Sequence, residues 1–290
     1  YSSNVGSNNN YSMSFDGVDD YVEIQDSSLE ILGANGFTFM GWFKSDTWSG
    51  PTGSAFIMEL TNYYSANGGS QRIHIGATPS GTFVSLCEGV DMPGWNFHTG
   101  NVLPFNQWVN LAMTYDSVQN TVILYVNGYN IEDTTANNNI KINLDKTGNK
   151  RFGKTPVNNN RYGKFISSEI TIWDFALDSI QIQNYMNCPP TGNETGLVGY
   201  WNFEEGSGNT ALDLSGNGND GTINGATYDT NVPPQSCNLT NANGCDSIAV
   251  LNLTINHADT SYTNITACDS VVWNGTTYNS SGTYSYSGST

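Results

Sequence analysis

The chain has 290 residues, which suits one large β domain with a small addition, or two ordinary domains. Its 9 Lys and Arg residues against 26 Asp and Glu residues leave a net charge of −17. This balance argues against a nucleic-acid partner, which needs basic side chains to displace phosphate counterions, and against an anionic membrane surface. The apolar runs fall short of the ~20 residues of a membrane-spanning helix, so we expect no membrane insertion.

The residue types indicate a mostly β protein. Asn, Gly, Ser, Thr and Tyr are abundant, while Ala, Glu, Lys and Arg, the good helix formers, are scarce. Hydrophobic residues make up 37% of the chain, enough to fill a core. The chain begins at Tyr1 with no recognisable signal peptide, so we expect an internal or processed fragment.

Alternating apolar residues predict strands separated by turn residues. In chain order the predicted strands are 11–15, 21–24, 37–43, 72–75, 82–86, 108–115, 121–126 and 165–173. Asn127-Gly128 follows one of them and is a strong signal for a tight hairpin turn.

The periodicity changes at residues 178–186. Ile182, Tyr185 and Met186 share one helical face there, and Asp178 stands where a helix N-cap is expected. We therefore predict one short helix and little other helical structure.

Beyond the helix, residues 197–228 again read as strand, turn and strand. After Pro233-Pro234 the chain is rich in Ser and Thr and has no basic residue. Two Cys-Asp-Ser triplets, at Cys245 and Cys268, each precede an apolar strand, as at the start of a repeated β module. We predict a first domain over 1–237 and a partial module over 238–290.

Five segments occur in the order typical of one family. They are Phe15-Asp-Gly-Val-Asp-Asp-Tyr-Val-Glu-Ile24, Phe37-Thr-Phe-Met-Gly-Trp-Phe43, Gln107-Trp-Val-Asn-Leu-Ala-Met-Thr-Tyr115, Leu124-Tyr-Val-Asn-Gly128 and Ile172-Trp-Asp-Phe-Ala-Leu177. With them the chain resembles the laminin-G-like, or concanavalin A-like, jelly-roll superfamily, and the last segment resembles its pentraxin branch. The resemblance implies an all-β fold of two antiparallel sheets packed face to face, with one short helix.

The segment 197–230 departs from the family order, because its counterpart normally precedes the Phe15 strand. It either opens a second, truncated domain or returns to close the same sandwich. A lone two-stranded piece exposing Trp201 and Phe203 would be barely stable in water, which favours closure. Cys188 and Cys237 bracket the segment, and a disulfide between them would hold the closing strands.

The same segment carries a candidate metal site. Asp213, Ser215, Asn217 and Asn219 place oxygen-bearing side chains on every second residue, and Ca²⁺ takes about six to eight oxygen ligands. The family resemblance implies calcium at Asp213 and Asn219, beside the turn that begins at Asp16. The alternative is a solvated turn capped by its own Asn and Asp side chains.

Aromatic rings in Gly-rich connections are candidates for glycan binding, because sugars stack on flat rings beside polar groups. The predicted ligand-binding residues are Trp48, Tyr63, Tyr64, Trp95 and His98. The alternative is that many of these rings pack over the open ends of the sandwich.

Basic residues are concentrated in one stretch. Seven of the nine lie at Lys141, Lys146, Lys150, Arg151, Lys154, Arg161 and Lys164. Edge strands commonly carry Lys to discourage sheet-to-sheet pairing. The alternative is a docking patch for an acidic or sulfated polysaccharide, or for an acidic neighbouring module.

Other chemistry is poorly supported. A glycoside hydrolase needs two carboxylates about 5–9 Å apart, and the Glu-x-Asp-x-x-Glu pattern of β-glucanases is absent. The three His residues are scattered, which disfavours zinc. Cys87 reads as a buried thiol, and Cys245 and Cys268 either pair or stay separate.

The sequence thus predicts a non-catalytic binding or adhesion module, secreted or on the cell surface, that recognises glycans and holds structural Ca²⁺. A laminin-G-like domain followed by Cys-Asp-Ser repeats resembles the organisation of very large surface proteins of marine Bacteroidetes. The alternative is a structural spacer or filament element whose partners are neighbouring modules of the same protein. A glycoside hydrolase is the least favoured interpretation.

Overall fold

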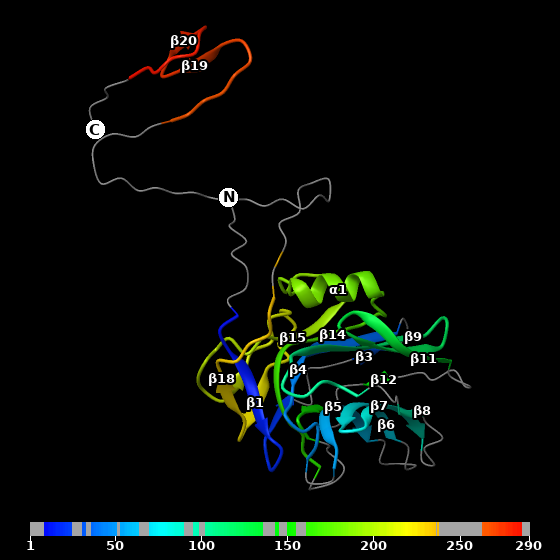
Figure 1. Cartoon of the computed structure of the whole chain (residues 1–290). Coiled ribbons are helices and arrows are strands. Elements are labelled where there is room, and N and C mark those ends of the chain that lie inside the picture. Colours follow the sequence, from blue (N-terminus) through cyan, green and yellow to red (C-terminus); the bar gives the residue numbers. More distant parts are fainter. Residues whose placement is uncertain are drawn as a thin grey trace. The chain divides into compact units, whose positions relative to one another are not determined.

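The computed structural model describes residues 9–24, 31–32, 36–50, 53–63, 70–89, 95–98, 102–135, 143–144, 150–154, 161–235, 237 and 263–285. The chain divides into two compact units, Tyr1–Asn238 and Leu239–Thr290 (Figure 1). The described part confirms the predicted all-β class, with two large antiparallel sheets, one short helix and small additional sheets. None of its helices has the length and apolar run needed to cross a bilayer.

The first large sheet, sheet A, has eight strands. Their order is β11 (Tyr129–Thr135), β10 (Thr121–Val126), β9 (Val109–Asp116), β4 (Phe37–Lys44), β14 (Lys164–Trp173), β1 (Ser12–Asp16) and β18 (Thr227–Asp229), with β15 (Leu197–Trp201) also paired to β14. Asn127 and Gly128 have φ of 51° and 77°, the left-handed pair that a tight β10–β11 hairpin requires, so the predicted turn is confirmed.

The second large sheet, sheet B, also has eight strands. Their order is β16 (Thr210–Ala211), β17 (Gly221–Asn224), β2 (Tyr21–Ile24), β13 (Lys150–Phe152), β5 (Ala55–Tyr63), β6 (Ser70–Thr78), β7 (Gly81–Gly89) and β8 (Trp95–His98). Two short two-stranded sheets complete the described strands. They pair β3 (Ile31–Leu32) with β12 (Asn143–Leu144), and, in the second unit, β19 (Val271–Trp273) with β20 (Thr276–Tyr278).

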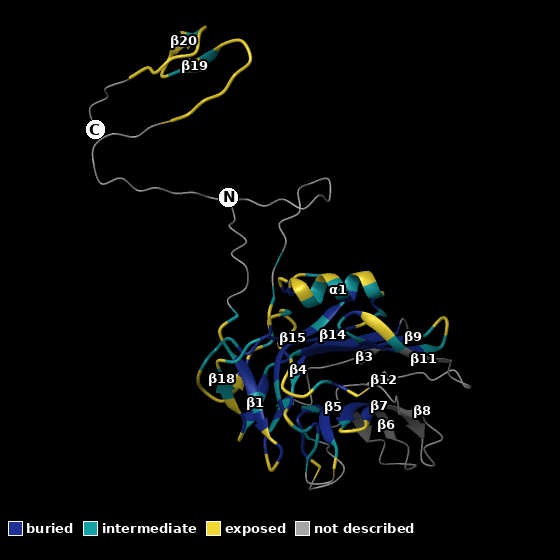
Figure 2. Ribbon diagram, viewed as in Figure 1, coloured by how far each residue is buried: buried dark blue, intermediate teal, exposed yellow. Residues whose placement is uncertain are grey.

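The main core lies between the two sheets (Figure 2). Aromatic side chains join the layers: Phe152 of sheet B meets Trp201 of sheet A edge-to-face, with ring centroids 5.1 Å apart. Within sheet A, Phe15 stacks on Phe165 at 4.7 Å. Burying rings of this size supplies much of the hydrophobic stabilisation of a sandwich.

Residues 197–230 lie in the first unit and add strands to both sheets. Strand β15 pairs with β14 and β18 with β1 in sheet A, while β17 pairs with β2 in sheet B. Trp201 and Phe203 are completely buried in the core. The side chains that would be exposed in an isolated hairpin thus find their burial in the sandwich that begins at β1.

The predicted helix is confirmed as α1 (Ser179–Asn187). Asp178 is its N-cap: the carboxylate accepts the backbone N–H of Gln181, and the Gln181 side chain accepts the N–H of Asp178. Ile182 is fully buried, and Tyr185 and Met186 pack beside it against sheet A. The helix therefore covers the outer face of sheet A (Figure 1).

Candidate functional site

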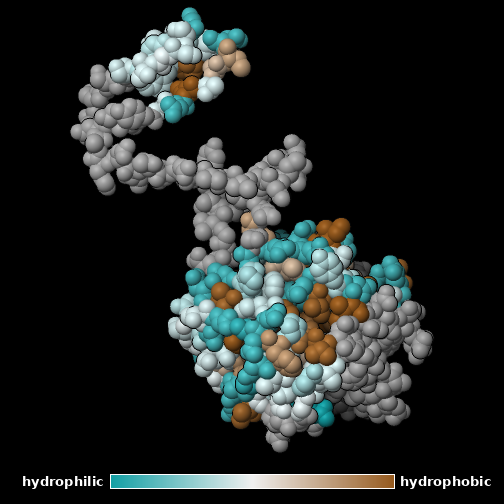
Figure 3. Space-filling model, in the orientation of Figure 1, coloured by the Kyte–Doolittle hydropathy of each residue, from teal (hydrophilic) through white to brown (hydrophobic). Residues whose placement is uncertain are grey.

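The outer faces of the two sheets differ. On sheet A, apolar side chains point outward and form a second core under α1, which comprises Met40, Ala112, Tyr125, Trp173, Leu177, Ile182, Leu197 and Tyr200. The solvent side of this region is mostly hydrophilic (Figure 3). In the described residues, this part of sheet A is therefore covered by structure of its own chain.

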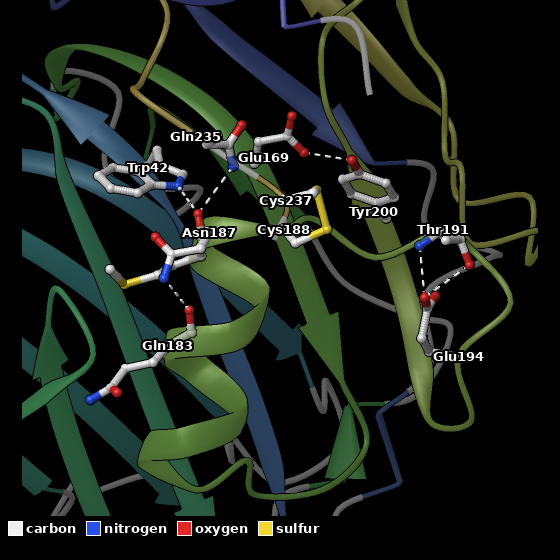
Figure 4. Close-up of a disulfide and its surroundings, with 11 residues drawn as sticks. Trp42, Glu169, Gln183, Asn187, Cys188, Thr191, Glu194, Tyr200, Gln235 and Cys237 are labelled. Carbon is white, nitrogen blue, oxygen red and sulfur yellow. Dashed lines mark hydrogen bonds between the residues drawn. A yellow bond between two sulfur atoms is a disulfide. The ribbon is translucent and has the colours of Figure 1, made fainter. Parts of the chain in front are cut away.

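A disulfide fastens this cover. Cys188, just after α1, is bonded to Cys237, the pair that the sequence predicted, with Cα atoms 4.5 Å apart (Figure 4). Next to it, the backbone oxygen of Met186 accepts hydrogen bonds from Trp42 Nε1 at 3.0 Å and from Gln235 Nε2 at 3.2 Å. These contacts tie the end of the helix to strand β4 and to the last residues of the first unit.

A buried carboxyl group lies under the same cover. Glu169 sits at a bulge in β14 with a left-handed φ of 55° and is 4% exposed. Its Oε2 accepts the hydroxyl of Tyr200 at 2.5 Å, while Oε1 is buried without a hydrogen-bond partner. Burial raises the pKa of Glu169 to about 8, so the group is largely protonated at neutral pH. No pattern in the sequence distinguished this residue.

The outer face of sheet B carries polar and aromatic side chains instead. In β2, Val22 and Ile24 face the core, so Tyr21 and Glu23 point to the opposite side. Arg151 of β13 pairs in register with Glu23 and shares that side. We call the outward residues that gather there the sheet B cluster: Tyr21, Arg151, Lys154, Tyr162, Arg161 and Phe56.

Cations lie over aromatic rings throughout this cluster. The ammonium of Lys154 stands 4.5 Å from the ring centroid of Tyr21 and 4.8 Å from that of Tyr162. The guanidinium of Arg151 lies 5.2 Å from Tyr21. That of Arg161 lies 5.6 Å from Phe56. All four distances are within the range of cation–π attraction.

The acids on this face have partners of their own. Arg151 donates to Glu23 Oε1 through Nη2 and, at 2.8 Å, through Nε. Glu59 is 1% exposed, and its carboxylate lies 3.3 Å from Nδ1 of His74. Neither carboxylate is free to face a bound molecule.

The basic residues of the predicted docking stretch divide into three groups. Lys150 is fully buried, and Lys164 Nζ forms an ion pair with Asp46 at 2.7 Å. Lys141 and Lys146 lie outside the described residues. Arg151 is paired with Glu23, whereas Lys154 and Arg161 contact aromatic rings and have no acidic partner among the described residues.

The prediction of Trp48 as a ligand-binding ring is wrong. Trp48 is completely buried, and its Nε1 donates to the backbone oxygen of Pro104 at 3.0 Å. Its left-handed φ of 46° marks a tight turn, and the ring packs into the main core. A Gly-rich connection therefore does not imply that its aromatic residue faces solvent.

The other predicted ligand residues are less informative. Tyr63 ends β5, and Trp95 and His98 begin and end β8, so these three are strand residues rather than loop residues. Their side chains lie outside the described part of the structure, as does Tyr64. Their role in binding stays a prediction.

In the predicted metal loop, the carboxylate of Asp213 is occupied by backbone N–H groups. Oδ1 accepts from Tyr200 and Ser215 and Oδ2 from Asn219, each at 2.9 Å. This is the bonding of a capped turn, because each N–H aims a positive charge where a cation would have to sit.

The remaining side chains of this loop turn their donors toward one strand carbonyl. The Ser215 hydroxyl and the amides of Asn217 and Asn219 all donate to the backbone oxygen of Val198, at 3.1, 3.1 and 2.7 Å. The one buried oxygen left without a partner is Asn219 Oδ1. A calcium ion needs about six oxygens, so these donors fit a hydrogen-bonded turn and do not fit calcium.

Asp16 does not lie beside Asp213. Asp16 pairs with Lys164 at one end of β14, while Tyr200, which donates to Asp213, pairs with Thr171 near the other end. Seven residues of strand separate the two positions, roughly 23 Å at about 3.3 Å per residue. The predicted shared corner is therefore wrong, because β1 and β15 flank different stretches of the same strand.

Asp16 instead meets two other acids. Carboxylate oxygens of Asp16, Asp19 and Asp20 lie within 4.8 Å of one another. Asp16 accepts the N–H of Val18, and Asp20 accepts that of Asp16. Burial, together with the charges of Asp16 and Asp19, raises the pKa of Asp20 above its ordinary value. The hydrogen bonds of the turn itself account for this grouping.

The structure describes only part of the three remaining cysteines. Cys268 is an exposed free thiol, so the structure does not pair it. Cys245 lies outside the described residues, as does the side chain of Cys87 in β7.

Comparison with known proteins identifies the family. A laminin-G model of the concanavalin A-like lectin/glucanase superfamily matches residues 16–183. The chain belongs to this superfamily. The match covers more than half of the chain and confirms the resemblance seen in the sequence. No curated protein matches the sequence.

Solved structures share the fold of this superfamily member. A candidate carbohydrate-binding protein from Bacteroides ovatus matches with a TM-score of 0.56 and 18% identity over 79% of this chain. The heptameric SAP-like pentraxin of Limulus polyphemus matches with a TM-score of 0.52 and 12% identity, over 77% of this chain and 95% of its own. The chain spans 62% of the Bacteroides ovatus protein. At these identities the likeness establishes the fold alone.

Proposed function

We propose that the first unit is a non-catalytic carbohydrate-binding module that holds its glycan on the sheet B cluster. The observation that carries this proposal is the contrast between the two outer faces: the helix covers sheet A, whereas sheet B presents Tyr21, Arg151 and Lys154 outward. Membership of a lectin-containing superfamily and the candidate function of the Bacteroides ovatus relative support it.

The cluster has the two elements that sugar recognition uses. A sugar ring has an apolar face that stacks on an aromatic ring, and hydroxyls around its edge that need hydrogen-bond partners. Tyr21 is half-buried and supplies the ring, while Arg151 and Lys154 supply N–H donors beside it. The sheet beneath is rigid, so little order is lost when a ligand binds.

Binding without catalysis is favoured by the state of the acids. A glycosidase needs two carboxyl groups facing the scissile bond. On this face Glu23 is bound by Arg151, and Glu59 is buried against His74. A sugar lying on the cluster would meet neither as a free acid or base.

The test is binding of the full chain to a glycan array, followed by calorimetry on the strongest ligands. Tyr21→Ala is expected to lower affinity at least fivefold, because stacking on this ring is lost, whereas Tyr21→Phe retains most of it. The matched control is Tyr129→Ala, which removes a 70% exposed Tyr from sheet A. If Tyr129→Ala lowers the affinity as much as Tyr21→Ala does, the glycan does not bind specifically at Tyr21.

An array without any hit would refute the proposal. If such a protein also self-associated, the spacer or filament interpretation would be the better one.

Secretion or cell-surface display, and an adhesive role, belong to the same proposal. The Cys188–Cys237 disulfide supports an oxidising compartment. Structural calcium stays a prediction that the hydrogen-bond donors of the Asp213 loop do not favour, and its test is thermal unfolding with calcium and with chelator. A ligand at 100 times its Kd adds about 2.7 kcal/mol of stability, so unchanged unfolding would remove calcium from the proposal.

A further inference from the structure

We infer that the sheet B cluster selects glycans that carry carboxylate groups, through Lys154 and Arg161. This inference rests on the proposed function and specifies its ligand class. The two residues contact aromatic rings on the outer face of sheet B and have no acidic partner among the described residues.

The first observation is the pairing state of the cations. The chain has 26 acids and only 9 bases, so acidic partners are plentiful. Arg151 is neutralised by Glu23, and Lys164 by Asp46. Within the described residues, Lys154 and Arg161 have ring contacts and no acidic partner. A cation without an acidic partner can attract the charge of an anionic ligand.

The second observation is how these cations are held. Lys154 stands between the rings of Tyr21 and Tyr162, at 4.5 and 4.8 Å. An aromatic ring attracts a cation without cancelling its charge, so the ammonium is positioned and still able to bind an anion. Pre-positioning of this kind lowers the entropy lost on binding.

Arg161 adds a directional contact. Its side chain is exposed, and its guanidinium lies over Phe56 at 5.6 Å. The planar guanidinium can offer two parallel N–H groups to the two oxygens of one carboxylate. A flat anion therefore fits this residue well.

Among the described residues, the acids nearest to these cations have other partners. Glu23 accepts from Arg151, and Glu59 is buried beside His74. In the turn before Tyr21, the carboxylates of Asp16 and Asp20 accept backbone N–H groups.

Uronic acids are the carboxylated sugars that fit this arrangement. Their carboxylate is attached directly to the sugar ring, so one residue of the glycan can stack on Tyr21 and place its charge at Lys154. A sulfate ester is linked to its sugar through an oxygen atom, so its charge lies further from the sugar ring than the charge of a uronate. We therefore assign the ligand to polysaccharides that contain uronic acid.

The experiment measures binding of the full chain to polygalacturonate, alginate and hyaluronate. The control for each polymer is its carboxyl-reduced form, which keeps the sugar backbone and loses the charge. We expect at least one acidic polymer to bind tenfold or more tightly than its reduced form, and to weaken as salt is raised. Dextran sulfate tests the sulfate alternative, and tighter binding of it than of every uronate would overturn the assignment.

Three variants locate the charge. Lys154→Gln and Arg161→Gln are each expected to weaken binding of the acidic polymer about tenfold, as when a hydrogen bond to a charged group is lost. Lys164→Gln is the matched control, since this Lys is already paired with Asp46, and it should stay within twofold of the parent. Thermal unfolding of all three variants checks folding, and Lys154→Arg should restore binding.

The two proposals fail in different ways. If every reduced polymer binds as tightly as its acidic form, the carboxylate inference is wrong and the glycan-binding proposal stands. Unchanged binding in both Lys154→Gln and Arg161→Gln would also overturn the inference. If neither these polymers nor the neutral glycans of the array bind, both proposals are wrong.

Discussion

The two outer faces of the sandwich differ in which side chains the strands turn outward. Sheet A turns Met40, Ala112 and Trp173 outward, and these residues need a cover, which α1 provides. Sheet B turns Glu23 and Arg151 outward, and these remain stable in contact with water. One face is therefore consumed in holding the fold together, while the part of the other face around Tyr21 and Arg151 is where we propose that a ligand binds. A few substitutions should therefore not be able to exchange the roles of the two faces. Four predictions test this contrast.

The largest effect is expected under the helix. Trp173 is 1% exposed, and its ring centroid lies 4.6 Å from that of Tyr185 in α1. Trp173→Ala should lower the free energy of unfolding by about 3–5 kcal/mol, because it leaves a large cavity in the second core. Urea unfolding measures it, and Tyr129→Ala on the same sheet, at 70% exposure, should cost less than about 0.5 kcal/mol. Equal losses would remove the distinction between covered and open positions.

The second prediction concerns pH and the buried Glu169. Burial raises its pKa from 4.5 to about 8 in the folded state. Between these values the unfolded chain has lost the proton that the folded chain keeps, so stability falls as pH rises through this window, by about 5 kcal/mol at most. Glu169→Gln has no ionisable side chain at this position, so it loses this pH dependence of stability, and it keeps an acceptor for Tyr200. Its stability should therefore decline less from pH 5 to pH 9, and equal slopes in urea unfolding would contradict the prediction.

The third prediction concerns the loop that anchors β15. Asp213 caps three backbone N–H groups, including that of Tyr200 in the second core. Asp213→Ala should lower the free energy of unfolding by about 2 kcal/mol, because these donors lose their common acceptor. The loss should be the same with calcium and with chelator. A loss seen only with calcium present would restore Asp213 as a metal ligand.

The smallest effect on stability is expected on the open face. Glu23→Gln breaks a partly exposed ion pair with Arg151 and should change the free energy of unfolding by less than about 1 kcal/mol. It also frees a third cation in the sheet B cluster. Binding of uronate polymers should therefore strengthen, by about threefold at 0.1 M salt, and weakened binding would mean that Glu23 itself contacts the ligand.

Much of the fold could be predicted from local patterns. The alternation in 37–43 indicated the strand that became β4, and Asn127-Gly128 indicated the turn after β10. Asp178 and the apolar spacing after it indicated α1. These features are local, since each depends on a few adjacent residues and on backbone preferences that act within one turn or strand.

The residues that we propose for binding could not be predicted in the same way. Trp48 and Tyr21 are both aromatic residues next to turns, yet the first is buried and the second lies at the open face. Lys150 and Arg151 are adjacent, and the pleat sends the first into the interior and the second outward. A shift of one residue in strand register would exchange them, and register is set by distant partners.

The sequence by itself determined the fold class, the family, the helix and the partners of the disulfide, because hydrophobic period, turn chemistry and ordered motifs are properties of short segments. Only the tertiary structure decided that 197–230 completes both sheets, that Asp16 and Asp213 stay apart, and that Lys154 stands between Tyr21 and Tyr162. These are contacts between strands remote in sequence. Their formation depends on which surfaces the whole sandwich can bury, and no short segment carries that information.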